Sequence, residues 1–394
     1  MIDLSKYSVS CLVAFLLVLF ASASDVYASG DACVDLEVLG TYNGSGVVAV
    51  DVAVVGDTAY LADGAAGIRI LDVGDPAAPV LLGSYLGSGS FYGVTVAGDI
   101  VYANSANQSF PGGTLHIFDA SDPASPSPLH LFPSPDGGAG AVAVSGDTAC
   151  MIDSSANGVF VFDVSDPAVF DFVGSYDTAG QNLIGVCVEG DRAYVIDQFT
   201  GLHIVDVSNP ASPSLLGSYN APGQEAELAV VGDRAYVANG FSGLHILDVS
   251  DPSSVVLLGT SDSHSASRVA VEGSTAYVID DGFFGDLLVI DVSDAASPVV
   301  MGSYDSPGFA LDIAVSGDTA YFTDGSSGLQ IIGVSGCNTC AADLTGDGSL
   351  NFLDVSAFLS AFGSQDPIAD FESDGSFNFL DVSAFLAAFG AGCP

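Results

Sequence analysis

Two short stretches near the C-terminus carry oxygen-bearing side chains at the spacing of a calcium-binding loop. The first stretch, 343–354, has them at positions 1, 3, 5, 9 and 12, with a glycine at position 6 and Ser349 at position 7. Calcium takes several hard oxygen ligands around a sharp turn, including the backbone carbonyl at position 7. The pattern returns 27 residues later, at 370–381. One match is explained by a chance acidic turn, whereas two in register predict metal binding. The residues at these positions are Asp343, Thr345, Asp347, Ser349, Asn351 and Asp354, and then Asp370, Glu372, Asp374, Ser376, Asn378 and Asp381.

Each loop is followed by the same apolar sequence, V-S-A-F-L-x-A-F, which predicts helices over 355–362 and 382–389. Helical spacing places four apolar residues of the first helix on one stripe, namely Val355, Phe358, Leu359 and Phe362. Because so small a domain needs its aromatic residues for a core, we expect this stripe to be buried within the domain rather than offered to a partner.

A loop with a single exit helix, present twice and with Asp rather than Glu at position 12, resembles a type I dockerin. The resemblance implies a domain over 340–394 that folds on binding two calcium ions at these twelve residues and docks onto a cohesin-like receptor outside the cell. Thr345 replaces the usual Asp or Asn, so the first loop has three carboxylates against four in the second, and the two affinities should differ. Phe352–Leu353 and Phe379–Leu380 stand where cellulosomal dockerins often carry hydroxyl groups. We therefore expect a receptor other than a standard cellulosomal cohesin, or anchoring within the molecule.

The middle of the chain consists of seven copies of one sequence repeat. The phrase V-x-G-D-x-A-Y recurs from Val54–Tyr60 to Val315–Tyr321, with its glycines 41 to 48 residues apart. Each copy leads into a strand-like line such as L-H-I-V-D-V, and six continue through a turn such as S-D-P into a fourth apolar segment. The Gly-Asp pair predicts a two-residue hairpin. Four short strands per unit, apolar on both faces and at this period, predict the blades of a β-propeller.

The two ends of the repeat array complement each other. The last unit has three strands, between Leu311 and Val334, whereas Val34–Tyr42 reads as a fourth strand without its first three. Placing this N-terminal strand on the outer edge of the seventh blade closes the ring. We expect an all-β, seven-bladed β-propeller over 33–336, closed by an N-terminal outer strand, together with the small α-helical, dockerin-like EF-hand domain.

The repeat lines also carry a resemblance. The lines GLHIVDVSNPASP and GLHILDVSDP resemble the LVIVD-repeat family, whose members are predicted to form propellers on exported bacterial and archaeal proteins. The resemblance covers the chain from about Val34 to Val334. It implies the fold and says little about biochemistry.

The first 28 residues have the order of a secretory signal. Lys6 precedes an apolar run over 9–21, and small residues follow up to Ala28. The run is shorter than the roughly 20 residues that a membrane-spanning helix needs. We expect a secreted or cell-surface protein with no transmembrane segment after signal cleavage.

Export makes disulfide bonds possible. Antiparallel pairing of the first and last propeller strands would bring Cys33 toward Cys337 or Cys340, and the other of these two would reach Cys393. A bond between Cys150 and Cys187 of adjacent blades is the less favoured reading, because small buried roles are common for cysteine in cores. The spacing of Cys337 and Cys340 matches half of a zinc site, but no second Cys or His pair accompanies it.

The charge excludes one class of partner. The chain has 48 acidic residues against 5 basic ones, a net charge of -43, so it cannot neutralise phosphates and we exclude nucleic acid. Charged residues are only 13% of the chain and apolar residues 49%, which excludes a disordered acidic protein. We assign much of the acid to Asp residues of the repeated turns and a further share to the two calcium-binding loops.

A search for catalytic chemistry yields no G-x-S-x-G, H-E-x-x-H or P-loop motif. His116, His203 and His245 share one slot of a repeated strand, so we expect them to face a neighbouring blade. Recognition should lie on the propeller face with variable connections, because loops on a rigid scaffold are the usual place for it. The candidate ligand-binding residues there are Phe91, Tyr92, Gln224, Glu225, His264 and Arg268.

Two functions remain open. The first is a non-catalytic exported binding or scaffold protein that presents its propeller loops to a protein or glycan and is attached by its dockerin-like tail. The second is a dockerin-borne carbohydrate-active enzyme, a polysaccharide lyase or glycoside hydrolase, with its active site on the variable-loop face. The carboxylates mostly follow the repeat, which favours binding over catalysis. Two non-repeated carboxylates with raised pKa in a central pocket would reverse this preference.

Overall fold

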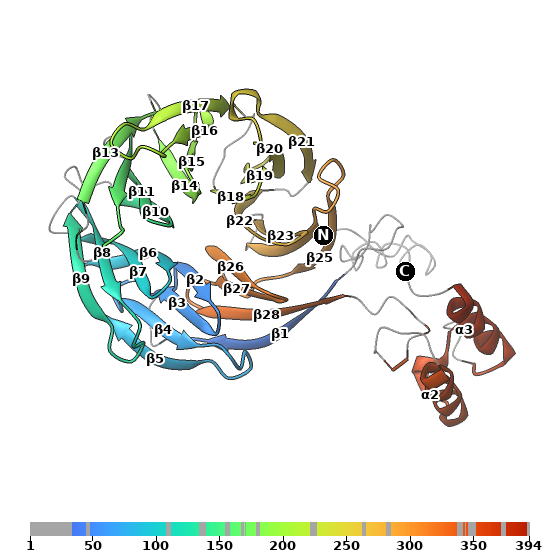
Figure 1. Cartoon of the computed structure of the whole chain (residues 1–394). Coiled ribbons are helices and arrows are strands. Elements are labelled where there is room, and N and C mark those ends of the chain that lie inside the picture. The colour runs from blue at the N-terminus through green and yellow to red at the C-terminus, as the bar shows by residue number, and fades with distance from the viewer. Residues whose placement is uncertain are drawn as a thin grey trace, which may run out of the picture. The chain divides into compact units, whose positions relative to one another are not determined.

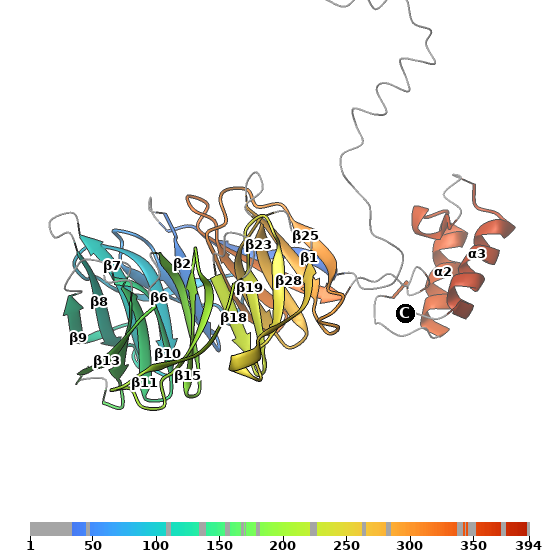
Figure 2. The ribbon, with the colours of Figure 1, turned by 90° about the horizontal axis from the view of Figure 1, so that it is seen from above.

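The protein was analysed as a computed structural model. The structure describes residues 34–44, 48–107, 112–133, 139–153, 158–166, 169, 171–178, 182–220, 227–261, 265–280, 285–336, 342, 344–345, 352–371 and 376–391. Its strands form seven antiparallel sheets of four strands each, arranged as the blades of a ring (Figure 1). Figure 2 shows the ring edge on, with the strands running through its thickness. The predicted seven-bladed β-propeller is confirmed.

The first four blades follow one another along the chain. Blade 1 contains β2 (Asp51–Val55), β3 (Thr58–Ala62), β4 (Ile68–Asp72) and β5 (Val80–Tyr85). Blade 2 contains β6 (Ser90–Ala97), β7 (Ile100–Asn107), β8 (Gly112–Asp119) and β9 (Ser127–Pro133). Blade 3 contains β10 (Ala139–Ser145), β11 (Thr148–Asp153), β12 (Gly158–Asp163) and β13 (Asp171–Asp177). Blade 4 contains β14 (Leu183–Glu189), β15 (Arg192–Asp197), β16 (Gly201–Asp206) and β17 (Ser214–Tyr219).

The last three blades complete the ring. Blade 5 contains β18 (Glu227–Val231), β19 (Arg234–Ala238), β20 (Leu244–Asp248) and β21 (Val256–Ser261), with the short 3-10 helix η2 (Pro252–Ser254) before β21. Blade 6 contains β22 (Ala266–Glu272), β23 (Thr275–Asp280), β24 (Asp286–Asp291) and β25 (Val299–Tyr304). Blade 7 contains β26 (Asp312–Ser316), β27 (Thr319–Thr323), β28 (Leu329–Gly336) and, on its outer edge, β1 (Val34–Tyr42).

The outer strand of blade 7 therefore comes from the other end of the chain. β1 runs antiparallel to β28, from the pair Val34 and Gly336 to the pair Tyr42 and Leu329. Its Gly40 has the role that the glycine of the L-G-S-Y segment has in other blades. A Cβ at Gly40 would lie 2.1 Å from the carbonyl oxygen of Pro76 in the next blade. Glycine is required at this position because the D-P turn of the following blade packs directly on the strand backbone.

The Gly-Asp hairpins form as predicted. The seven hairpin glycines, from Gly56 to Gly317, all have positive φ between 55° and 59°. A Cβ at Gly56 would meet nothing within 4 Å. Backbone conformation rather than lack of space therefore accounts for glycine here. The aspartates of the D-V-S-D-P turns accept hydrogen bonds from backbone N–H groups two residues further on, as Asp72 does from Gly74 and Asp122 from Ala124. The turn interpretation of these aspartates is confirmed.

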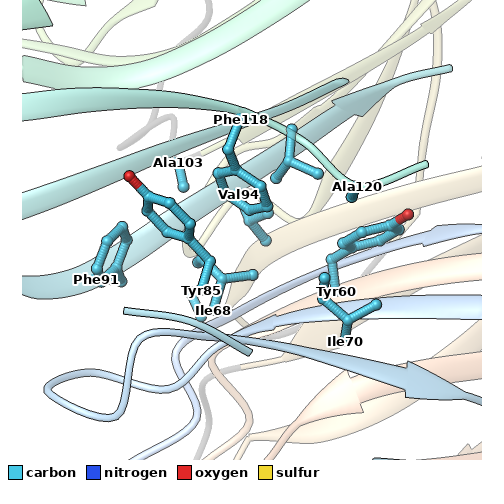
Figure 3. Packing of buried hydrophobic residues seen from close by; sticks show 11 residues of the cluster. Tyr60, Ile68, Ile70, Tyr85, Phe91, Val94, Ala103, Phe118 and Ala120 are labelled. Carbon is cyan, nitrogen blue, oxygen red and sulfur yellow. The ribbon is translucent and has the colours of Figure 1, made fainter. Parts of the chain in front are cut away.

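The hydrophobic core lies between blades, not within them. In the described part of the chain, each pair of neighbouring blades, including blades 7 and 1, encloses a buried cluster. Figure 3 shows the cluster between blades 1 and 2, where Tyr85 stacks on Phe118 with ring centroids 4.1 Å apart. Side chains alternate along β3, so Tyr60 packs toward blade 2 and Leu61 toward blade 7. This alternation explains why the strands are apolar on both faces.

Two helices follow the propeller in the sequence, and they are longer than predicted. They are α2 (Phe352–Ser364) and α3 (Phe379–Ala391), with the 3-10 helix η3 (Pro367–Ala369) between them. Both begin before position 12 of the predicted loops, so Asp354 and Asp381 lie in their first turns. Phe358 stacks on Phe385 with ring centroids 4.1 Å apart.

The predicted buried stripe of the first helix is correct in three of its four members. Phe358 is buried, and Val355 and Phe362 pack against the same small cluster. Leu359 is exposed, so its assignment to the stripe is wrong. It lies one residue, or about 100°, around the helix from Phe358, and a cluster centred on two stacked rings is too narrow to cover it.

The remaining predictions about the chain ends fall largely outside the described residues. The proposed signal and Cys33, Cys337, Cys340 and Cys393 lie there. Within the described residues, no helix combines the length and apolar character needed to cross a membrane. Cys150 and Cys187 are free thiols, which confirms that interpretation. Burial raises the pKa of Cys150 to about 12 and that of Cys187 to about 11, so both are protonated and unreactive near neutral pH.

Candidate functional site

One position of the repeat meets its six counterparts around a pocket on the axis. It is the residue five places before each hairpin glycine, near the start of the innermost strand of each blade. We call these seven residues the axial ring. They are Asp51, Gly93, Ala141, Gly185, Glu227, Arg268 and Asp312, and all of them line a pocket of about 730 Å³.

The antiparallel strand order decides on which face the axial ring lies. The Gly-Asp hairpins and the D-P turns join strands at one face, so the inner strands start at the opposite face, where the variable connections lie. Figure 1 shows these inner strands, among them β2, β14 and β26, around the centre of the ring. The pocket is therefore on the face where the sequence predicted recognition.

The chemistry of the axial ring is divided between two arcs. Blades 5, 6, 7 and 1 contribute Glu227, Arg268, Asp312 and Asp51, which are all charged. Blades 2, 3 and 4 contribute only glycine or alanine. The arc of blades 5, 6, 7 and 1 therefore supplies the ionisable groups of the axial ring, and the arc of blades 2, 3 and 4 leaves room in the pocket because its side chains are absent or small.

Each acidic member of the axial ring also joins two blades. Asp51 Oδ2 accepts a hydrogen bond from the backbone N–H of Val94 at 2.8 Å, and Asp312 Oδ2 accepts one from Val52 at 2.9 Å. Glu227 receives a backbone hydrogen bond from Val269. In every case the donor follows the axial-ring residue of the next blade. These carboxylates therefore provide hydrogen-bond acceptors for backbone N–H groups near the starts of the inner strands. The glycine and alanine residues of the other arc have no side-chain acceptor.

Crowding of the acids alters their protonation. Burial raises the pKa of Asp51 well above its usual range, and the charge of Asp312 and a side-chain hydrogen bond with it add to the rise. Burial, followed by the charge of Asp312, raises the pKa of Glu227 to about 8, although Arg268 opposes this. Arg268 Nε lies 3.5 Å from Glu227 Oε2. These shifts favour the protonated form of Asp51, and near neutral pH they keep Glu227 mostly protonated.

The other wall of the pocket contains a polar group with an unused acceptor. Asn104, at 1% exposure, donates from Nδ2 to the carbonyl oxygen of Gly140. This bond orients the amide and leaves its Oδ1 buried with no hydrogen-bond partner. Beside it, a Cβ on Gly93 would stand 3.3 Å from Asn104 Nδ2 and 3.5 Å from Asp51 Oδ2. The missing side chain at Gly93 therefore leaves a small space between an amide and a carboxylate.

Sequence reasoning identified part of this site. Tyr92 and Arg268 line the pocket. Phe91 is buried in the cluster between blades 1 and 2 and is not part of the pocket lining. Gln224, Glu225 and His264 lie outside the described residues. The prediction missed Asp51, Glu227, Asp312 and Asn104. Comparison of the aligned repeats at the axial-ring position would have found the three acids, because the residue type there changes from blade to blade.

The repeated histidines belong to a second, structural set of polar contacts. His116 lies 2.9 Å from Ser105 Oγ through Nε2, and its Nδ1 lies 3.4 Å from the hydroxyl oxygen of Tyr85 in the neighbouring blade. His203 Nε2 lies 2.8 Å from Thr200 Oγ1. Burial lowers the pKa of both histidines and of His245, so they are neutral near pH 7. The prediction that this slot faces a neighbouring blade is confirmed for His116.

The described parts of the C-terminal loops show the surroundings of both position-12 carboxylates. Asp354 Oδ1 accepts hydrogen bonds from the backbone N–H of Thr345 at 3.0 Å and from its hydroxyl at 2.8 Å. Asp381 Oδ2 accepts one from the backbone N–H of Asn378 at 2.8 Å. The backbone carbonyl of Ser376 accepts one from Asn378 Nδ2 at 3.1 Å. Asp370, at position 1 of the second loop, directly follows η3 in the sequence. The other predicted ligands, Asp343, Asp347, Ser349, Asn351, Glu372 and Asp374, lie outside the described residues.

No group of three or more His, Cys, Asp or Glu side chains is placed to hold a metal ion among the residues that the structure describes. These described residues include the axial pocket and parts of the two loops, but not the six loop residues named in the preceding paragraph.

The fold and the axial pocket define a seven-bladed β-propeller of repeated four-stranded units. The sequence profile of the LVIVD repeat matches residues 47–87, 136–178, 184–221, 222–263, 264–306 and 307–338, which is more than half of the chain. The chain belongs to the LVIVD repeat family. Blade 2, whose strands lie between residues 90 and 133, falls between two of the matched segments. No curated protein matches the chain.

Solved structures share the fold at low sequence identity. The WD40 β-propeller domain of Doa1 aligns with a TM-score of 0.61 and 10% identity, over 76% of this chain and 96% of that one. A functionally unknown protein from Desulfotomaculum acetoxidans aligns with a TM-score of 0.56 and 16% identity, over 66% and 86%. The computationally designed Ika8 protein aligns with a TM-score of 0.55 and 8% identity, over 75% and 98%. At these identities the likeness extends to the fold alone.

Proposed function

We propose that the protein is an exported, non-catalytic binding protein whose propeller recognises a glycan or protein ligand at the axial pocket. One observation carries the proposal. On a scaffold that repeats its turns and core seven times, the axial ring changes its chemistry from blade to blade and encloses a pocket of about 730 Å³. That size and position suit ligand binding, since sites on propellers and barrels usually lie in such central depressions.

Exposed aromatic residues on the same face support this proposal. Phe199 and Phe241 lie in the turns that join the second and third strands of blades 4 and 5, and Phe309 precedes the first strand of blade 7. All three are largely exposed, and Phe241, at 83% exposure, contributes to the pocket lining. Large apolar side chains left exposed around a pocket are typical of an interaction site.

The C-terminal residues 340–394 are proposed to form a dockerin-like domain that binds two calcium ions and attaches the protein to a cell-surface or extracellular receptor. Asp354 and Asp381 are fully buried acids at the starts of helices; Asp354 accepts a hydrogen bond from the Thr345 hydroxyl, and Asp381 accepts one from the backbone N–H of Asn378. Carboxylate oxygens fit a hard cation. A bound calcium ion would supply the folding energy that a cluster of so few buried residues lacks.

A duplicated apolar surface on this tail supports docking. Phe352 and Phe379 are equally exposed, and the pairs Leu353 and Leu380, and Leu359 and Leu386, repeat the arrangement. These six residues are exposed on both helices at matching positions. An apolar surface that is present twice fits a cohesin-like or other protein receptor.

Export and ring closure complete the proposal. We assign residues 1–28 to a cleaved signal, 33–336 to the propeller and a secreted or surface location to the product. Because Val34 pairs with Gly336, the cysteines that flank this pair in the sequence are Cys33 and Cys337. A disulfide from Cys33 to Cys337 or Cys340 would lock β1 onto β28. Peptide mapping without reduction tests this, and it would be contradicted by free thiols at all three positions.

The propeller function is tested by a glycan array and a protein pull-down with the exported chain in calcium. We expect a ligand whose affinity falls at least tenfold on Phe241→Ala. Asp57→Asn, in a hairpin turn on the opposite face, serves as the matched control and should bind normally. Binding that is unchanged by Phe241→Ala and by every pocket variant would place recognition elsewhere and contradict the proposal.

A second candidate function is favoured by the raised pKa values of Asp51 and Glu227. A protonated carboxyl beside an ionised one is the arrangement that a glycoside hydrolase uses for acid and base catalysis. We rank it second because Asp51, Glu227 and Asp312 all occupy one position of the repeat. Each of them also accepts a hydrogen bond from the backbone of the next blade, which is a structural role. Incubation with a panel of polysaccharides, followed by detection of new reducing ends or unsaturated sugars, separates the two. The enzyme would lose about 10²–10⁴-fold of its turnover on Glu227→Gln. A binding protein yields no product in the first place.

A further inference from the structure

We propose that the axial pocket binds a ligand through a protonated primary amine. The inference rests on the proposed function of the pocket as a binding site and names the chemical class of its ligand. It is carried by the charged residues of the axial ring, the acceptor on Asn104 and the space left by Gly93.

The charge inventory of the pocket favours a cation. Three carboxylates, on β2, β18 and β26, face one guanidinium, on β22. The inner strands β6, β10 and β14 contribute no charged group at the axial ring. Arg268 lies beside Glu227, so the acid pair of Asp51 and Asp312 is the part of the ring with no cation of its own. A positive charge placed there would offset the burial and the repulsion from Asp312 that raise the pKa of Asp51.

Acceptors dominate this part of the pocket as well. Asp51 and Asp312 each use one oxygen for a backbone N–H of a neighbouring blade, and each carboxylate can accept further bonds. Asn104 Oδ1, buried in the pocket wall, has no hydrogen-bond partner. An ammonium group has three donors and no acceptor, which complements such a set of oxygens. A ligand hydroxyl or an anion would leave these acceptors less well satisfied.

The space for the head group lies at Gly93. The position of its missing Cβ is 3.5 Å from Asp51 Oδ2 and 3.3 Å from Asn104 Nδ2, the nitrogen that donates to Gly140, so the carboxylate is the acceptor nearest to this space. Gly93 has no positive φ, so backbone conformation does not require glycine there. The absence of a side chain instead opens the pocket wall between the carboxylate and the amide. Further out, the exposed ring of Phe241 can cover the apolar part of the ligand or contact its charge.

Binding is coupled to proton release. The raised pKa of Asp51 favours its protonated carboxyl in the free protein, and a bound ammonium group favours the ionised form, so amine binding releases protons to solvent. Affinity for an alkyl amine such as putrescine should therefore rise as the pH increases from 6 to 8.5, because this amine stays protonated over that range, whereas the less basic amine of an amino sugar loses its proton within it. Arg268 and Glu227 are the other charged groups that face the pocket from the axial ring, and ionisation of Glu227 in this pH range acts in the same direction.

The test is titration calorimetry on the exported chain in calcium, with two sources of primary amine. Putrescine represents linear polyamines, and a trimer of β-linked glucosamine represents amino sugars. Their matched neutral probes are 1,4-butanediol and the N-acetylated trimer. We expect at least one amine to bind tenfold or more tightly than its neutral probe, measured at pH 8 for putrescine and at pH 6 for the glucosamine trimer so that each amine is protonated, with a heat that depends on the ionisation enthalpy of the buffer. The amine that binds identifies the source.

Three variants locate the binding. Asp51→Asn keeps an acceptor for Val94 and should weaken amine binding at least tenfold. Gly93→Ala fills the space and should also weaken it, with thermal unfolding unchanged, so the test does not depend on Asp51→Asn alone. Asp57→Asn is the control and should bind as the parent does.

Several results would overturn the inference. They are equal binding of the neutral probes, normal binding by both pocket variants, or calcium competing for the pocket in place of the amine. If no amine binds but the glycan or protein screen finds a ligand that depends on Phe241, the binding function stands and only the ligand class is wrong. If neither screen finds a pocket ligand, both proposals fail.

Discussion

The propeller and the C-terminal tail bury their apolar residues in opposite ways. Each blade shares its core with two neighbours, and blade 7 meets blade 1, so the ring has a buried cluster at every junction. The tail has one small cluster, centred on Phe358 and Phe385 and completed by Ala342 and Ala369. A closed array spreads its stability over many similar interfaces, whereas so small a core depends on each ring in it and on help from outside.

Removal of calcium should separate the two regions most clearly. With a chelator present, we expect the amides of α2 and α3 to lose their protection from hydrogen exchange, because the binding free energy of the metal is folding free energy in so small a domain. The amides of strands such as β19 should keep theirs. Hydrogen exchange on the full chain, read by mass spectrometry, measures both regions at once. Equal protection of α2 and α3 with and without calcium would contradict the assignment of the loops.

Truncation of one buried ring comes next in size. Phe358→Ala should cost about 3–5 kcal/mol of unfolding free energy, which is enough to unfold the tail while the propeller stays folded. Phe358 is 1% exposed and stacks on Phe385. Phe352→Ala is the matched control, because Phe352 is largely exposed and its loss should change stability by no more than about 0.5 kcal/mol. Tyrosine fluorescence and circular dichroism report the two regions separately, since the chain has no tryptophan.

One type of substitution should have opposite effects in the two regions. At Gly217 of β17, a Cβ would lie 1.7 Å from the carbonyl oxygen of Pro252 in the next blade. Gly217→Ala should therefore destabilise the propeller by about 1–3 kcal/mol. At Gly363 of α2 a Cβ would meet nothing within 4 Å, and Gly363→Ala should stabilise the helix by about 0.5–1 kcal/mol. Denaturant unfolding of both variants tests this, and effects of the same sign would contradict it.

The smallest expected effect concerns pH and the axial ring, because the Glu227 side chain is 34% exposed and solvent screens much of its electrostatic energy. Burial and the charge of Asp312 raise the pKa of Glu227 to about 8 in the folded protein. An acid whose folded-state pKa is raised stabilises the fold fully below its unfolded pKa, near 4.3. That stability is lost as the pH rises through about 8. Glu227→Gln should therefore flatten the fall in propeller stability between pH 5 and pH 9. Denaturant unfolding at both pH values measures this, and a parallel fall in parent and variant would show that Glu227 is ordinary.

Much of the propeller could be read from the chain because its signals are local. The positive φ of Gly56 follows from a two-residue hairpin, and the turn aspartates such as Asp72 bind backbone groups two residues away. Even the glycine of the outer strands had a visible pattern, L-G-S-Y, although its reason, the close approach of the D-P turn of the next blade, is seen only in the structure.

The axial site could not be read in the same way. Asp51 and Asp312 are separated by 261 positions in the sequence. The hydrogen bond from the backbone N–H of Val52 to Asp312 spans almost the same distance, 260 positions. Taken one at a time, they look like any of the other acidic residues in this sequence. Their contact, and the raised pKa of Asp51 that results, exist only when β2 and β26 become neighbours on the axis.

The amino-acid sequence by itself determined the number of blades, the hairpins and the turn chemistry, because these depend on repeat count and on interactions within a few residues. It also determined the spacing of the oxygen-bearing residues near the C-terminus. The tertiary structure decided which repeat position faces the axis, that its charges gather on one arc while glycine and alanine open the other, and that Leu359 faces solvent. The reason is physical: a local sequence sets backbone conformation, whereas burial and electrostatic coupling depend on which distant strands become neighbours.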